Sequence, residues 1–220
     1  MQEIILLVDM FQKHADPEKA IPMENYMKNH FPFLGIKTPE RNQILKEFFQ
    51  ETEIIKKPFS HEFVNGLWSL KEREYHYAAL AYCQQFKKGF TDEDLPFFEK
   101  LITTNSWWDT ADIIAPHIIG DIAGKFPAVI SKNIDKWATD ENRWLRRSAI
   151  LFQLKYKSNT DADLLYHYCL LNADSKEFFV QKAIGWALRE YSKTNSESVR
   201  SFIQSHSLPK LSLREARKYI

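Results

Sequence analysis

Two tryptophans, an aspartate and several arginines and lysines are the residues of this chain whose types and spacing suit chemistry. Trp108 and Asp112 are four residues apart in the segment SWWDTAD, so on a helix they share one face. A carboxylate beside an indole ring stabilises a cation that is bound or is forming in a reaction. A positive charge about 4 Å from a carboxylate gains about 4 kcal/mol at an effective dielectric constant of about 20, which is worth about three decades of rate if it is felt only in the transition state.

The same residues also have structural interpretations. Most tryptophans pack in a core, and we expect this of three of the six in the chain, namely Trp68, Trp137 and Trp144. Asp112 is flanked by apolar residues and could form a salt bridge with an arginine of a neighbouring helix, for which Arg147 is the candidate. The two interpretations of Asp112 are compatible, because a salt bridge can hold a carboxylate in place before it acts.

The elements that must position these residues are helices. Apolar residues recur at i, i+3, i+4 spacing through most of the chain, for example over residues 74–88, and strand-like alternation is too short to assign. Thr38 precedes Pro39, which predicts that the Thr38 hydroxyl caps a helix. We therefore predict an all-α fold with no β-sheet.

The helices follow a repeat with a period of 35 residues. Three similar segments, EYHYAALAYCQQF, WLRRSAILFQLKY and FVQKAIGWALREY, begin at residues 74, 144 and 179, and a weaker copy interrupted by Pro116 begins at residue 109. Second helices are expected near 94–104, 127–138, 161–173 and 195–206. Paired helices of this length predict an α-α superhelix, a solenoid of HEAT-like repeats. We expect a single domain over residues 1–220, with an irregular helical cap over 1–60 and paired-helix repeats over about 61–220.

The repeat also aligns polar residues along the chain. Four of them occupy equivalent positions at an offset of 35, namely Tyr77, Asp112, Arg147 and Lys182. Equivalent positions face the same side of a stack of repeats. Within two turns on the same helices are Arg143, Trp186 and Arg189. The sequence therefore predicts one face that carries a carboxylate, several cations and two indoles.

The formal net charge of +1 hides an uneven distribution. From Arg143 to the end there are 14 Lys and Arg against 7 Asp and Glu, a surplus of +7, which leaves −6 for residues 1–142. A basic C-terminal third with aromatic residues among its cations suits binding to a phosphate backbone. The same cations could also form an ordinary solvated surface.

Several other kinds of site have no matching pattern in the sequence. Neither a Gly-rich phosphate-binding loop, nor Cys and His at metal-ligand spacing, nor a Ser or Cys nucleophile motif is present. The N-terminal segment has no signal-peptide pattern, and no apolar run approaches the ~20 residues that span a bilayer. We therefore expect a cytoplasmic protein that needs no metal or organic cofactor and has no membrane partner.

The chain resembles the AlkD-like DNA alkylation repair glycosylases, a bacterial family with HEAT-like repeats. The resemblance runs in order over essentially the whole chain, and four segments carry it: YMKNHFPFLGIKTPER (26–41), NSWWDTADIIA (105–115), WLRRSAILFQLKYK (144–157) and SKEFFVQKAIGWALREYSKTN (175–195). It implies a monofunctional glycosylase that removes cationic N3- and N7-alkylated purines, such as 3-methyladenine and 7-methylguanine, from double-stranded DNA. It also implies that Asp and Trp side chains stabilise an oxocarbenium-like sugar while the base stays in the helix.

The resemblance assigns roles to particular residues. The catalytic cleft would consist of Trp108, Asp112, Arg147 and Trp186. Contacts with DNA are expected from Tyr26, Thr38, Arg143, Lys182 and Arg189. We expect the protein to act as a monomer without a cofactor.

Two other functions stay open at this point. A non-catalytic HEAT-repeat relative would bind distorted or branched DNA through the same basic face and release no base. A scaffold for protein interactions would have little affinity for DNA and no steep salt dependence of binding.

Overall fold

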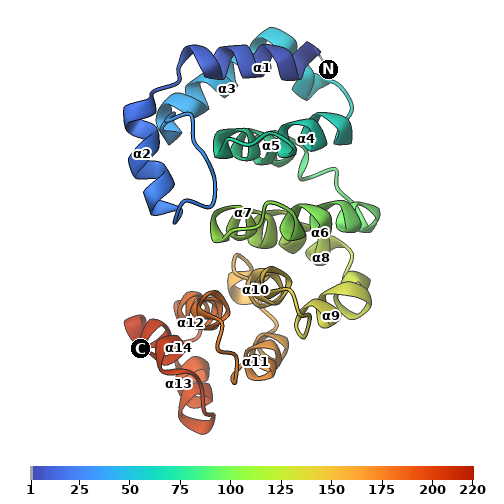
Figure 1. Cartoon of the computed structure of the whole chain (residues 1–220). Coiled ribbons are helices and arrows are strands. Elements are labelled where there is room, and N and C mark those ends of the chain that lie inside the picture. Colours follow the sequence, from blue (N-terminus) through green and yellow to red (C-terminus); the bar gives the residue numbers. More distant parts are fainter. Residues whose placement is uncertain (1) are drawn as a thin grey trace. The chain divides into compact units, whose positions relative to one another are not determined.

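The computed structural model describes residues 2–220, and its regular elements are helices (Figure 1). No strand occurs among these residues, so the predicted all-α fold is confirmed. The chain groups into two compact units, Met1–Lys88 and Gly89–Ile220. The sequence predicted a single domain over residues 1–220, and this stays a prediction. Within residues 2–220, no helix is both long and apolar enough to cross a membrane.

Over its described residues, 2–88, the first unit contains five α-helices and packs around aromatic side chains. Its helices are α1 (Gln2–Lys13), α2 (Pro17–Tyr26), α3 (Thr38–Thr52), α4 (His61–Trp68) and α5 (Arg73–Phe86), with a short 3-10 turn at Ile54–Lys56. The rings of Phe11 and Tyr75 stack at 5.6 Å, and those of Phe48 and Phe63 stack at 5.9 Å. Stacked aromatic pairs of this kind therefore join α1 to α5 and α3 to α4.

A buried carboxylate holds the loop between α2 and α3. Both oxygens of the fully buried Glu74 accept backbone N–H groups of the loop, at 3.0 Å from Leu34, 3.0 Å from Gly35 and 3.1 Å from Ile36. Gly35 has φ +90°, and a Cβ there would lie 2.0 Å from the carbonyl oxygen of Asp16, so only glycine fits. Glu74 thereby sets the path of the chain into α3.

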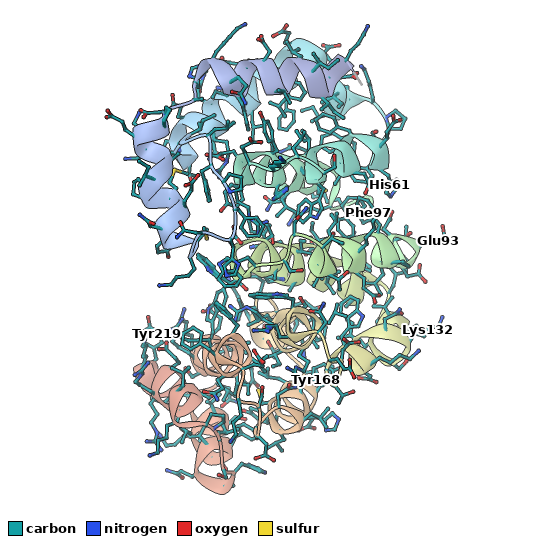
Figure 2. All side chains as sticks on the ribbon, in the orientation of Figure 1. His61, Glu93, Phe97, Lys132, Tyr168 and Tyr219 are labelled. Carbon is teal, nitrogen blue, oxygen red and sulfur yellow. The ribbon has the colours of Figure 1, made fainter. Side chains whose placement is uncertain are left out.

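The second unit contains the remaining α-helices. They are α6 (Leu95–Thr103), α7 (Trp108–Ile114), α8 (Gly120–Lys125), α9 (Asp135–Trp137), α10 (Arg143–Leu151), α11 (Ala162–Leu171), α12 (Phe178–Ser192), α13 (Ser196–Ser205) and α14 (Lys210–Ala216). Side chains fill the space between them (Figure 2). Tyr168 of α11, labelled in Figure 2, donates its hydroxyl to Asp135 of α9.

The predicted 35-residue repeat is confirmed by where the helices begin. The first helix of each repeat starts at Arg73, Trp108, Arg143 and Phe178, and the second helices lie within the predicted ranges. In the second unit α10 packs against α7 of the preceding repeat and α12 of the following one (Figure 1). Equivalent positions on these three helices are therefore brought side by side.

Pro116 explains why the copy at residue 109 matches the repeat poorly. The helix that begins at Trp108 widens into a π-helix over Ala115–Ile119 before α8 continues it. Proline has no N–H to donate and its ring displaces the preceding turn, so a regular α-helix cannot run through this position. The structure accommodates the proline by this wider turn.

The predicted cap at Thr38 is wrong by one residue. The N-cap of α3 is Lys37, which makes no capping side-chain bond, and Thr38 is the first helical residue. The Thr38 hydroxyl accepts a hydrogen bond from Arg41 at 3.4 Å. Pro39 therefore occupies the second helical position, where its missing N–H is still harmless.

Candidate active site

The centre of the site is an ion pair between α7 and α10. Arg147 donates from Nε to Oδ1 of Asp112 at 2.7 Å and from Nη2 to Oδ2 at 2.8 Å, so both carboxylate oxygens are engaged. The side chain of Arg147 is 5 % exposed and that of Asp112 is 15 % exposed. The salt bridge predicted from the repeat offset is therefore confirmed, and the carboxylate keeps an opening to solvent.

Arg147 also reaches the third helix of the site. Its Nη1 donates to the backbone carbonyl of Phe179, in the first turn of α12. Its guanidinium carbon lies 5.9 Å from the ring centroid of Trp186, within the range of a cation–π contact. One guanidinium therefore joins α7, α10 and α12, and it contacts both Asp112 and the ring of Trp186.

Burial controls the protonation of Asp112. It raises the pKa of Asp112 above the usual range, because the charged form loses hydration, while the hydrogen bonds and charge of Arg147 lower it. The two charged N–H groups of Arg147 favour the ionised form and hold the carboxylate in a fixed orientation. Such a group can stabilise a cation that develops at its exposed edge, and it can accept a proton from a water molecule there.

The two tryptophans of SWWD occupy different positions at the start of α7, since Trp107 is its N-cap and Trp108 is its first residue. Trp107 packs its ring against Trp144 at 5.6 Å and against Phe179 at 5.0 Å, which ties α7 to α10 and α12. Trp108 is the first residue of α7 and is half-buried, one turn before Asp112 on the same helix. The expected core positions of Trp68, Trp137 and Trp144 are confirmed, since these residues are 5 %, 3 % and 7 % exposed.

The cations expected to contact DNA in the second unit lie on α10 and α12. Arg143, the first residue of α10, is exposed and pairs with Glu177 at 2.8 Å. Lys182 and Arg189 lie one turn before and one turn after Trp186 on α12. Their side chains are 34 % and 23 % exposed, and both pair with Glu215 of α14.

The two expected contacts in the first unit lie at either end of the loop held by Glu74. Tyr26 is the last residue of α2 and is 69 % exposed, and Thr38 is the first residue of α3. The roles of all nine predicted site residues remain predictions. What the structure brings together is the group of Asp112, Arg147 and Trp186, with Trp108 on the same helix as the aspartate.

Three contacts that hold predicted residues had not been predicted, one in the first unit and two in the second. Glu74 and Glu215 are buried carboxylates that hold predicted site elements, and the carbonyl of Phe179 completes the bonding of Arg147. Backbone acceptors carry no signal in a sequence. Glu215 had a weak signal, because it lies 33 residues after Lys182, close to the repeat period.

The fold and the site define an all-α repeat protein in which an arginine holds a carboxylate and contacts an indole ring, an arrangement that suits stabilising a cation. No group of three or more His, Cys, Asp or Glu in residues 2–220 is placed to hold a metal ion. The chain belongs to the family described as DNA alkylation repair enzyme, whose model matches residues 7–220. The chain is thus a DNA repair enzyme with DNA as its substrate, and the family resemblance of its motifs is confirmed.

A solved structure supports the same assignment. It is described as a predicted DNA alkylation repair enzyme from Enterococcus faecalis, is 33 % identical in sequence, and superposes with a TM-score of 0.86. The match covers 94 % of this chain and 96 % of that one. No curated protein matches the sequence.

Proposed function

We propose that this protein is a monofunctional DNA glycosylase that hydrolyses the N-glycosidic bond of cationic N3- and N7-alkylated purines, such as 3-methyladenine and 7-methylguanine. One observation carries the proposal. The Asp112 side chain is 15 % exposed and is held by two hydrogen bonds from Arg147, and the ring of Trp186 lies beside Arg147. That arrangement suits a reaction whose transition state carries positive charge.

The chemistry of the lesion explains why so little machinery is needed. A purine alkylated at N3 or N7 carries a positive charge, so the bond from C1′ of the sugar to the base breaks with its electron pair going to the base, which leaves neutral. The sugar becomes oxocarbenium-like, and water then adds to C1′. Asp112 stabilises this cation and orients or deprotonates the water, while the faces of Trp108 and Trp186 attract the cationic base and sugar.

Selectivity would come from the charge and lability of the lesion. Many glycosylases turn the target base into a shaped pocket, whereas Asp112 here would act on the deoxyribose while the base stays stacked. Bulky adducts should then be tolerated. Tyr26, Thr38, Arg143, Lys182 and Arg189 would contact the backbone of a duplex, and the protein would work as a monomer without a cofactor.

The test is the release of 7-methylguanine from methylated duplex DNA under single-turnover conditions. We expect the wild type to release the base, and Asp112→Asn to slow it by about 100-fold or more, since a charge about 4 Å from the developing cation is worth about 4 kcal/mol. Asp163→Asn is the matched control, because Asp163 is an exposed carboxylate in the first turn of α11.

Two outcomes would overturn the proposal. One is an undiminished rate for Asp112→Asn, after circular dichroism has shown both proteins folded at the assay temperature. The other is a wild type that shifts duplex or branched DNA in a gel but releases no base, which would support the non-catalytic DNA-binding function instead.

A further inference from the structure

Glu215 of α14 lies at the centre of three cations. Its Oε1 is 2.9 Å from Nζ of Lys182, and its Oε2 is 3.0 Å from Nη1 of Arg189 and 2.8 Å from Nζ of Lys218. The side chain of Glu215 is only 8 % exposed. Hydrogen bonds from Lys218 and Lys182 hold the pKa of Glu215 at about 2, so the group is ionised at neutral pH.

A close approach of two helices puts Glu215 there. A Cβ at Gly185 of α12 would lie 2.5 Å from Cβ of Glu215 and 2.8 Å from the carbonyl oxygen of Ser212, so α14 seats directly on the glycine. Ser212 also donates its hydroxyl to the carbonyl of Gln181 at 2.8 Å. The carboxylate is therefore carried by a packed interface and has a fixed position.

The three cations stay partly open to solvent. The side chain of Lys182 is 34 % exposed, that of Arg189 is 23 % exposed and that of Lys218 is 49 % exposed. Among residues 2–220, Glu215 is the acceptor of each of these three cations, and the group of four carries a net charge of +2. Lys218 belongs to the last turn, Arg217–Tyr219, and Tyr219 is labelled in Figure 2 near α12, where Lys193 lies 5.3 Å from its ring centroid.

The position of this group relates it to the candidate active site. Lys182 precedes Trp186 by four residues and Arg189 follows it by three, so the two cations flank the indole on one face of α12. Trp186 in turn lies beside Arg147, which holds Asp112. A phosphate bound by these cations would therefore sit next to the site of reaction.

We propose that Glu215 is a positioning residue, which gathers Lys182, Arg189 and Lys218 into a binding site for one DNA backbone phosphate beside Trp186. The proposal rests on the proposed function and adds Glu215 and Lys218 to it. Three neighbouring cations repel one another, and a shared carboxylate keeps them together at fixed positions. The DNA backbone supplies the phosphodiester oxygens that such a group binds.

Glu215→Gln tests the proposal, because the amide keeps the size of the side chain and removes its charge. The charge of the group rises from +2 to +3, so binding to an undamaged duplex should tighten and should depend more steeply on salt concentration, because one fewer negative charge opposes the phosphate backbone. At saturating protein, single-turnover release of 7-methylguanine should fall by about 5-fold or more, since the cations beside Trp186 are no longer fixed.

Lys218→Gln tests the same site at a residue that lies outside helices α12 and α14. It should weaken duplex binding and reduce the salt slope by about 0.9, because one phosphate contact is lost. Arg200→Gln is the matched control: Arg200 is exposed on α13 outside the group, and it loses the same charge. An equal change of slope in the two variants would overturn the proposal.

The remaining outcomes separate a positioning role from a structural one. If Glu215→Gln lowers the melting temperature, the duplex affinity and the rate together, Glu215 only holds α14 in place and the proposal is wrong. Unchanged salt slope and rate would also refute it. A wild type that releases no base would contradict the proposed glycosylase function, while the binding measurements would still decide whether the phosphate site exists.

Discussion

Removing Arg147 should reveal how much the buried ion pair contributes and in which pH range. Arg147→Ala leaves the Asp112 carboxylate, 15 % exposed, without the two hydrogen bonds at 2.7 and 2.8 Å. Breaking one side of a buried pair costs about 3–5 kcal/mol, so we expect the free energy of unfolding at neutral pH to fall by about that amount. Urea denaturation at several pH values, with the slope on denaturant held common, measures it.

The sign of the pH dependence follows from the protonation of Asp112. Burial already raises the pKa of Asp112, and loss of Arg147 removes the largest opposing effect. In the variant the folded protein therefore holds a proton on Asp112 at a higher pH than the unfolded chain does, so acid conditions favour the folded state. The difference in free energy of unfolding between the wild type and Arg147→Ala should therefore become smaller as the pH falls. In the pH profile of the rate of base release, the acid limb should move to higher pH.

Arg143→Ala is the control for this prediction. Arg143 lies on the same helix and pairs with Glu177 at 2.8 Å, but the two side chains are 49 % and 37 % exposed, so its loss should cost only about 0–1 kcal/mol. The reasoning would be refuted by a similar small loss for Arg147→Ala, or by a deficit that grows as the pH falls.

Three further predictions concern packing and the indole. Gly185→Ala should lower the free energy of unfolding by about 1–3 kcal/mol in denaturation, because the new Cβ meets the backbone of Ser212 at 2.8 Å; a neutral effect would show that α14 can move away. Glu74→Gln should destabilise by at least about 1 kcal/mol, since the amide cannot accept all three loop N–H groups with both of its ends; unchanged stability would contradict the described clamp. Trp186→Ala should slow base release about 2- to 30-fold, matching a cation–π contact of about 0.5–2 kcal/mol, and an unchanged rate would remove the indole from the mechanism.

The residue at which the first helix of each repeat begins was predictable to within one position. The first helices were expected to begin near residues 74, 109, 144 and 179, and they begin at 73, 108, 143 and 178. This accuracy has a physical origin, because each repeat must bury the same face against its neighbours and the apolar pattern records that face. The pairing of Asp112 with Arg147 was predictable for the same reason, because the two residues are at equivalent positions of successive repeats.

Other contacts of the site could not be predicted from the pattern. The partners of Lys182 and Arg189 depend on how closely α14 approaches α12, which is decided by the missing side chain of Gly185 and not by any periodicity. The loop held by Glu74 depends on backbone N–H groups, which every sequence possesses. Local spacing predicts which residues share a helix face, but it does not predict which distant group will contact that face.

Arg147 also has a consequence for the way the second unit unfolds. In repeat proteins each unit contacts only its neighbours, so terminal repeats can fray while the rest stays folded. Arg147 on α10 bonds to Asp112 on α7 and to the carbonyl of Phe179 on α12, so one side chain couples three successive repeats. Fraying of α12 would release the guanidinium that orients the aspartate, and amide hydrogens of α7, α10 and α12 should therefore exchange as one cooperative group. The catalytic geometry and the folding cooperativity of these repeats would then be lost in the same event.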